Sequence, residues 1–201
     1  MEFLVNRGQI MKFYVDIKLI PNEEDNLGFL WNRVYTQMHL ALVGVKDENV
    51  NIGIGFSFPH YNNHDFPLGD TLRVFAESKE KLEELKIHKW LNRLDGYIYV
   101  GATKELPSDI KGYVHFARKQ FKTNPERLAR RQAKRKGISL KEALKNYEGM
   151  TEQTTKLPFV MMKSSGGQYM KIFIEKSISD EEVKGSFSTY GLSKTATVPW
   201  F

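Results

Sequence analysis

Apolar and polar side chains alternate from Lys12 to Ile20, with Phe13, Val15, Ile17 and Leu19 on one side. A period of two residues is typical of a strand with one buried face, and Pro21 ends the pattern. After Asn26 the period becomes helical, because apolar residues recur every three to four positions: Leu27, Leu30, Trp31, Val34, Met38, Ala41 and Leu42. The pattern therefore predicts a strand followed by an amphipathic helix.

The same kinds of pattern continue to residue 102. Further strands are predicted over residues 52–58, 71–76 and 97–102, and a second helix is predicted from Ser78 through Leu82 and Leu85 towards Trp90. The order strand, helix, strand, strand, helix, strand is that of a ferredoxin-like domain. We therefore predict an α+β protein with a ferredoxin-like domain at residues 11–105. Because this fold hosts many functions, the order of elements predicts no activity.

Residues 106–201 are predicted to form a C-terminal α+β domain, after a linker at residues 106–108. Alternation from Gly112 to Phe121 indicates a strand that places Arg118 and Gln120 on one side. Arginine suits the guanine edge and glutamine the adenine edge, although any strand can carry two polar residues. A short helix is predicted after Ser139, and the segments 159–163 and 168–174 around Ser164-Ser-Gly-Gly167 predict a hairpin.

Positive charge is concentrated between residues 118 and 136, which hold nine basic residues and one acid, whereas the whole chain has a net charge of +6. Asn124, Pro125 and Gly137 are typical start and stop residues for a helix over 125–136. Five cations at i, i+3, i+4, i+7 and i+8 share one face of it: Arg127, Arg130, Arg131, Lys134 and Arg135. We interpret this face as a phosphate-binding surface rather than an ordinary solvated one, because acids that could pair with it are scarce.

Composition narrows the possible classes of protein. A hydrophobic fraction of 41% and an aromatic fraction of 12% are typical of a folded chain, and zero cysteines exclude disulfides, thiolate catalysis and cysteine zinc sites. The sequence contains no phosphate-binding loop, acidic metal cluster or nucleophile elbow, so we predict neither a metal nor a cofactor. No apolar run approaches roughly 18 residues and no signal peptide is evident, so we expect a cytoplasmic protein. Residues 1–10 are treated as an extension without an assigned role.

Several segments resemble one family, the repeat-processing endoribonuclease of the Csy (type I-F) CRISPR system. They are residues 13–19, 38–39, 54–59, 122–128, 157–160, Tyr190-Gly-Leu-Ser-Lys194 and Val198-Pro-Trp-Phe201, and they occur in the family's order. The resemblance implies a ferredoxin-like domain and an arginine-rich helix. It also implies a protein that binds the stem-loop of a CRISPR repeat, cuts at the 3′ base of the stem without metal, stays on the product, and joins other subunits of a surveillance complex.

The resemblance also implies the site residues. Its catalytic residues fall on His39, Ser164 and Tyr190, with Ser165 as an alternative to Ser164 because the hairpin is one residue shorter. Its RNA-binding residues fall on Arg118 and Gln120, which would read bases, and on Arg131, Lys134 and Arg135, which would bind the groove. Lys134 stands where the family has arginine, and Met170 where it has a phenylalanine that stacks on the closing base pair.

The implied mechanism needs no group beyond the RNA and the protein. The 2′-OH beside the scissile phosphate is the nucleophile, His39 is the base, Ser164 holds the sugar and Tyr190 orients His39 or the backbone. The products would be a 2′,3′-cyclic phosphate and a 5′-OH. From the residues alone the chain is an RNA- or DNA-binding α+β protein, so two alternatives remain: a non-catalytic hairpin-binding subunit of a ribonucleoprotein, and a DNA-binding protein that tolerates deoxyribose.

Overall fold

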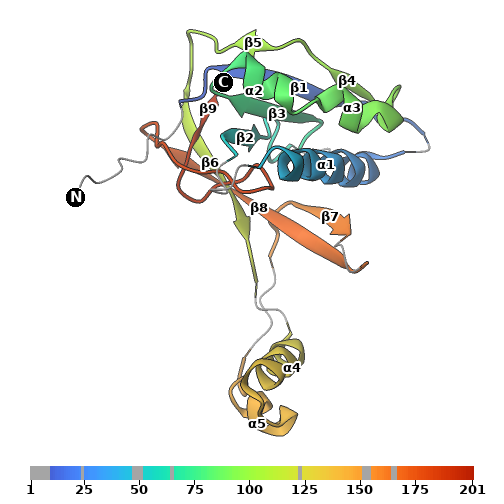
Figure 1. The fold of residues 1–201 in the computed structure, drawn as a ribbon, viewed down its shortest axis with the longest axis vertical. Coiled ribbons are helices and arrows are strands. Elements are labelled where there is room, and N and C mark those ends of the chain that lie inside the picture. The colour runs from blue at the N-terminus through green and yellow to red at the C-terminus, as the bar shows by residue number, and fades with distance from the viewer. Residues whose placement is uncertain are drawn as a thin grey trace. The chain divides into compact units, whose positions relative to one another are not determined.

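The computed structural model describes residues 10–23, 25–46, 52–63, 66–121, 124–150, 155–163 and 167–201, and its fold is α+β, as predicted (Figure 1). The chain forms two compact units. The first extends to Arg118 and resumes from Pro158 to Phe201, and the second comprises Lys119–Leu157. These units differ from the ranges 11–105 and 106–201, and the division of the chain into a ferredoxin-like domain and an RNA-binding C-terminal domain at those bounds stays a prediction.

The first unit contains two antiparallel sheets, of which the larger has the strand order β2-β3-β1-β4. Its strands are β1 (Phe13–Leu19), β2 (Ile54–Ser57), β3 (Thr71–Ala76), β4 (Ile98–Val100) and the short β5 (Lys104–Glu105), which pairs with the start of β1. β1 is central and pairs with β3 and β4. Val15, Ile17 and Leu19 of β1 are buried, so the predicted alternation is confirmed.

The helices of this unit begin where the sequence indicates. In α1 (Leu27–Gly44), the Asn26 side chain accepts a hydrogen bond from the Phe29 N–H. α1 buries most of the predicted apolar stripe and Tyr35 as well. The single helix predicted from Ser78 towards Trp90 is instead α2 (Lys79–Glu84) and α3 (Ile87–Leu91), followed by the 3-10 turn η1 (Asn92–Leu94). The break occurs at Lys86, whose φ of 48° is left-handed and interrupts the helical ladder.

The second sheet has the order β7-β8-β6-β9. Its strands are β6 (Gly112–Lys119), β7 (Phe159–Lys163), β8 (Tyr169–Ser179) and β9 (Val198–Trp200). The predicted hairpin is confirmed, since β7 and β8 pair from Phe159↔Phe173 to Lys163↔Tyr169. Buried residues of both sheets belong to one hydrophobic core, within which the Phe58 and Phe116 rings lie 5.0 Å apart. The C-terminal strands therefore share a core with the N-terminal half of the chain.

The second unit holds two helices, α4 (Pro125–Lys136) and α5 (Leu140–Lys145), drawn in yellow and orange in Figure 1. The bounds of α4 are those predicted: the Asn124 side chain accepts from the Arg127 N–H, and Gly137 ends the helix at a φ of 67°. Ala129 and Ala143 are the fully buried residues of the two helices. Among the described residues of the whole chain, no helix is both long enough and apolar enough to cross a membrane.

Candidate active site

The rings of His39 on α1 and Tyr190 in the loop before β9 stack on each other. Their centroids are 4.4 Å apart and their planes differ by 9°. Nδ1 of the half-buried His39 lies 2.7 Å from the carbonyl oxygen of Thr189. Because a carbonyl oxygen only accepts hydrogen bonds, Nδ1 carries the proton of the neutral ring and Nε2 keeps its lone pair. The neutral imidazole is therefore held in the tautomer that acts as a base through Nε2.

The loop that carries Tyr190 is hydrogen-bonded to three other elements. The Tyr35 hydroxyl of α1 donates to the Tyr190 carbonyl at 2.8 Å. The Phe56 N–H of β2 donates to the Gly191 carbonyl at 2.8 Å, and the Ser193 N–H donates to the Phe116 carbonyl of β6 at 2.9 Å. Elements that are distant in the sequence thus hold the backbone of the loop that carries Tyr190.

Tyr35 is fully buried beneath this loop. Burial raises the pKa of its hydroxyl well above the ordinary value; nearby Tyr190 raises this pKa further, and nearby Arg118 lowers it. The hydroxyl consequently stays protonated at neutral pH and acts as a donor to the Tyr190 carbonyl.

Arg118 also reaches Tyr190, from the end of β6. Its guanidinium carbon lies 4.8 Å from the centroid of the Tyr190 ring, a distance typical of a cation–π contact. Its buried Nε has no hydrogen-bond partner among the described residues. A buried donor without a partner is unfavourable, and an acceptor on a ligand, such as a phosphate or a base edge, would satisfy it. Gln120, predicted to act with Arg118, is exposed just beyond the end of β6.

Ser164 and its alternative Ser165 lie outside the described residues. Met170 of β8 is half-buried, pairs with Met162 of β7 and packs against the core. The structure thus brings together His39, Tyr190 and Arg118, while the roles assigned to all of these residues stay predictions.

The five predicted cations of α4 are all exposed in the second unit: Arg127, Arg130, Arg131, Lys134 and Arg135. Arg130 forms an ion pair with Glu126, one turn earlier. In the part of the chain that the structure describes, the other four have no ion pair. Arg131, Lys134 and Arg135 line a hollow of about 490 Å³ together with Leu128, Gln132 and Tyr147. Its charge suits a polyanion.

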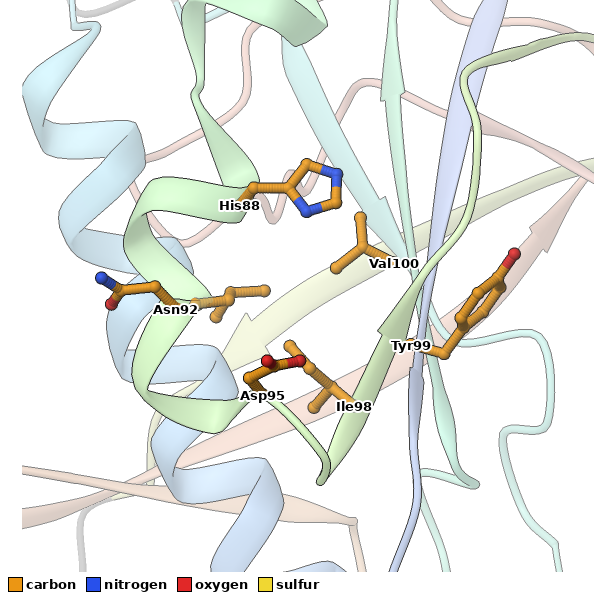
Figure 2. A pocket seen from close by; sticks show the side chains of 7 residues that line it. His88, Asn92, Asp95, Ile98, Tyr99 and Val100 are labelled. Carbon is orange, nitrogen blue, oxygen red and sulfur yellow. The ribbon is translucent and has the colours of Figure 1, made fainter.

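Another hollow, of about 460 Å³, lies between α3 and β4. Figure 2 shows His88 and Asn92 on one side of it and Ile98 and Val100 on the other. Its lining includes Asp95 but neither arginine nor lysine, and it contains none of the predicted site residues. We therefore do not assign it to nucleic acid.

Across the described residues, no group of three or more histidine, aspartate or glutamate side chains is arranged to hold a metal ion.

Sequence analysis missed three participants in the site: Tyr35, the Thr189 carbonyl and Gly191. One signal was available, because Tyr35 precedes His39 by four residues and so shares its helical face. The backbone carbonyl of Thr189 leaves no signal in the sequence, since every residue carries a carbonyl.

A histidine with its Nδ1 bound to a carbonyl, an adjacent arginine and a separate cationic helix are together typical of an α+β protein that acts on nucleic acid. The family model described as CRISPR-associated protein (Cas_Csy4) matches residues 14–201. A protein of Escherichia coli (strain UTI89 / UPEC) named CRISPR-associated endonuclease Cas6/Csy4 is 36% identical over 193 residues, covering 95% of this chain and 100% of the relative. One of Pseudomonas aeruginosa (strain UCBPP-PA14) with the same name is 35% identical over 195 residues, with the same coverages.

The chain belongs to the CRISPR-associated Csy4 family. The resemblance that the sequence motifs indicated is therefore confirmed, as is the predicted enzyme class, a CRISPR-associated endonuclease.

Proposed function

We propose that this chain is a metal-independent endoribonuclease that binds the stem-loop of a CRISPR repeat, cuts at the 3′ base of the stem and stays bound to the mature crRNA. The observation that carries the proposal is the state of His39. Its Nδ1 proton is engaged by the Thr189 carbonyl at 2.7 Å and its ring is stacked on Tyr190, which leaves Nε2 to act as a base. RNA supplies its own nucleophile, so a positioned base is the main chemical group that the protein must provide.

In the proposed reaction, Nε2 of His39 takes the proton of the 2′-OH upstream of the cut. The 2′-oxygen attacks the adjacent phosphorus, the bond from phosphorus to the 5′-oxygen breaks, and the departing oxygen takes up a proton. The products are a 2′,3′-cyclic phosphate and a 5′-OH. Tyr190 keeps His39 in place, and Ser164 holds the ribose so that the 2′-oxygen is in line with the leaving group.

Recognition is assigned to the remaining predicted residues. Arg118 and Gln120 read base edges in the lower stem, Met170 covers the closing base pair, and the cationic face of α4 binds phosphates. Nε of Arg118, which has no partner among the described residues, supports this role, because a base or phosphate would give that donor an acceptor. The scarcity of acids on α4 supports the phosphate-binding role, because among the described residues Glu126 alone pairs with a cation of this face.

The rest of the proposal concerns architecture and context. The strand order β2-β3-β1-β4 with antiparallel pairing supports a ferredoxin-like arrangement for residues 11–105, which present His39. Residues 106–201 would then form the RNA-binding part. We place the protein in the cytoplasm, with CRISPR repeat RNA and other subunits of a type I-F complex as partners.

The test is single-turnover cleavage of an end-labelled CRISPR repeat hairpin in excess EDTA. A second substrate is the same hairpin with 2′-deoxyribose only at the nucleotide immediately upstream of the cut. We expect cleavage of the first and none of the second. His39→Ala should lower the rate by roughly 10²- to 10⁴-fold and leave affinity unchanged, since positioned acid–base groups contribute that much.

His115→Ala is a matched control, because Nδ1 of half-buried His115 also contacts a backbone carbonyl, that of Ala196 at 3.0 Å, but is not among the site residues. It should cleave at the wild-type rate. A requirement for metal, or cutting of the deoxyribose substrate, would refute the 2′-OH mechanism. Tight binding without cleavage at any pH would support the non-catalytic hairpin-binding subunit instead.

A further inference from the structure

Neighbouring carbonyls in the Tyr190 loop accept hydrogen bonds from side chains one turn apart on α1. His39 Nδ1 contacts the Thr189 carbonyl at 2.7 Å, and the Tyr35 hydroxyl donates to the Tyr190 carbonyl at 2.8 Å. Residues at i and i+4 lie above one another on a helix, so one face of α1 holds two consecutive residues of the loop. The next carbonyl, of Gly191, accepts from the Phe56 N–H at 2.8 Å.

The Tyr35 hydroxyl is a fixed point for this loop. Its ring is fully buried, with the Phe56 ring at a centroid distance of 6.0 Å and the Phe58 ring at 6.4 Å. A tyrosine has few side-chain torsions, and burial between two aromatic rings restricts them further. By contrast, His39 is only half-buried, so its own packing constrains its ring less.

We propose that Tyr35 is a positioning residue for cleavage: its hydroxyl fixes the Tyr190 loop so that the Thr189 carbonyl meets Nδ1 of His39 and the Tyr190 ring stays on the imidazole. This inference rests on the proposed function, in which Nε2 of His39 is the base. It assigns to a core tyrosine the task of keeping the histidine in its productive tautomer.

Removing only the hydroxyl frees the Tyr190 carbonyl while keeping the aromatic ring in the core. The Thr189 carbonyl, one residue earlier, is then held less firmly, and the bond to Nδ1 weakens. A larger share of the neutral His39 rings then carries its proton on Nε2, where the ring cannot accept a proton from the 2′-OH. A purely structural hydroxyl would lower the stability of the protein without changing the chemistry of the folded molecules.

The experiment compares Tyr35→Phe with Tyr61→Phe. Tyr61 is a matched control, because its hydroxyl also donates to a backbone carbonyl at 2.8 Å, that of Ile174, and it lies outside the site. For each variant we would measure the single-turnover rate at saturating repeat hairpin across a pH series, the hairpin Kd, and the ¹⁵N shifts of His39 in the free protein.

For Tyr35→Phe we expect the rate at saturation to fall roughly ten- to a hundredfold, since a displacement of about 1 Å has effects of that order. Its Kd should stay unchanged, the pH profile of the rate should shift, and the ¹⁵N shifts should show a larger share of the Nε2–H form. Tyr61→Phe should match the wild type in all of these.

A wild-type rate, pH profile and tautomer in Tyr35→Phe would overturn the inference, as would equal effects in Tyr61→Phe. If the wild-type protein did not cleave RNA at all, the proposed function would fail. The ¹⁵N comparison would still decide whether Tyr35 positions His39, because it needs no RNA.

Discussion

Replacing Gly191 by alanine would test how closely the Tyr190 loop is held against the core. Gly191 has a φ of 68°, in the left-handed region that side chains other than glycine rarely adopt. A Cβ built there would meet Cγ of Phe56 at 2.3 Å and Cδ2 at 2.4 Å. Phe56 is only 1% exposed and lies in β2, so its ring has little space into which to move.

Two terms set the size of the effect. A non-glycine residue in the left-handed region costs about 1–2 kcal/mol. Inserting a methyl group into a packed core typically costs about 1–3 kcal/mol more, because neighbouring side chains leave their preferred rotamers. We therefore expect Gly191→Ala to lower the free energy of unfolding by roughly 2–5 kcal/mol, a large part of the roughly 5–15 kcal/mol of a typical domain.

Gly96→Ala separates the two terms. Gly96 also has a positive φ, of 84°, but a Cβ there would meet no heavy atom of the described residues within 4 Å beyond its own chain neighbours. Urea unfolding of both variants should give only the backbone cost for Gly96→Ala, and the difference between the variants is then the steric cost at Phe56. If both variants lost the same free energy of unfolding, the loop would move away from Phe56 freely, and the reasoning about a rigid Tyr190 loop would be refuted. In folded Gly191→Ala, cleavage should also be slower than in Gly96→Ala, since the displaced loop carries Tyr190 and the Thr189 carbonyl.

Two further predictions concern charge. Neutralising the five cations of α4 together should weaken hairpin binding and lower the slope of log Kd against log salt concentration by about 4.5, if the duplex-DNA relation is applied to five phosphate contacts. An unchanged slope would mean that the face does not contact RNA. Burial raises the pKa of Tyr35 in the folded protein, so its contribution to stability is complete below the ordinary tyrosine pKa of about 10 and is lost as pH rises above that value. As the pH rises from about 9 to about 11, the urea midpoint of Tyr35→Phe should therefore fall less than that of the wild type. Parallel curves of urea midpoint against pH would contradict this.

Local patterns in the sequence were sufficient to predict most elements of the fold. Alternation between Phe13 and Leu19, and the start and stop residues Asn124 and Gly137, depend on interactions within a few residues. The break at Lys86 was not predictable in this way, because lysine has no special preference for a left-handed φ. β9 was also missed, since its three residues include Pro199 and form a strand only by pairing with β6.

The site shows the same limit more sharply. His39 and Tyr190 could be selected because the resemblance implied their roles, and Arg118 because the resemblance and the strand alternation both singled it out. Their meeting depends on contacts between residues more than a hundred positions apart, such as that of the Tyr35 hydroxyl with the Tyr190 carbonyl. No periodicity within the chain encodes such a contact, so the tautomer of His39 could be inferred only from the structure.

The two units differ in what holds them together, and this difference bears on how binding and chemistry are divided. The groups around His39 are fixed by a buried tyrosine, a glycine against a buried phenylalanine, and backbone bonds from two sheets. In contrast, Ala129 and Ala143 are the fully buried residues of α4 and α5, while five like charges repel one another on the face of α4. A polyanion that neutralises those charges stabilises this unit by mass action. If these cations bind RNA as proposed, the charges that provide affinity also make the stability of the second unit depend on RNA, whereas the contacts of His39 with the Thr189 carbonyl and the Tyr190 ring are already present in the free protein.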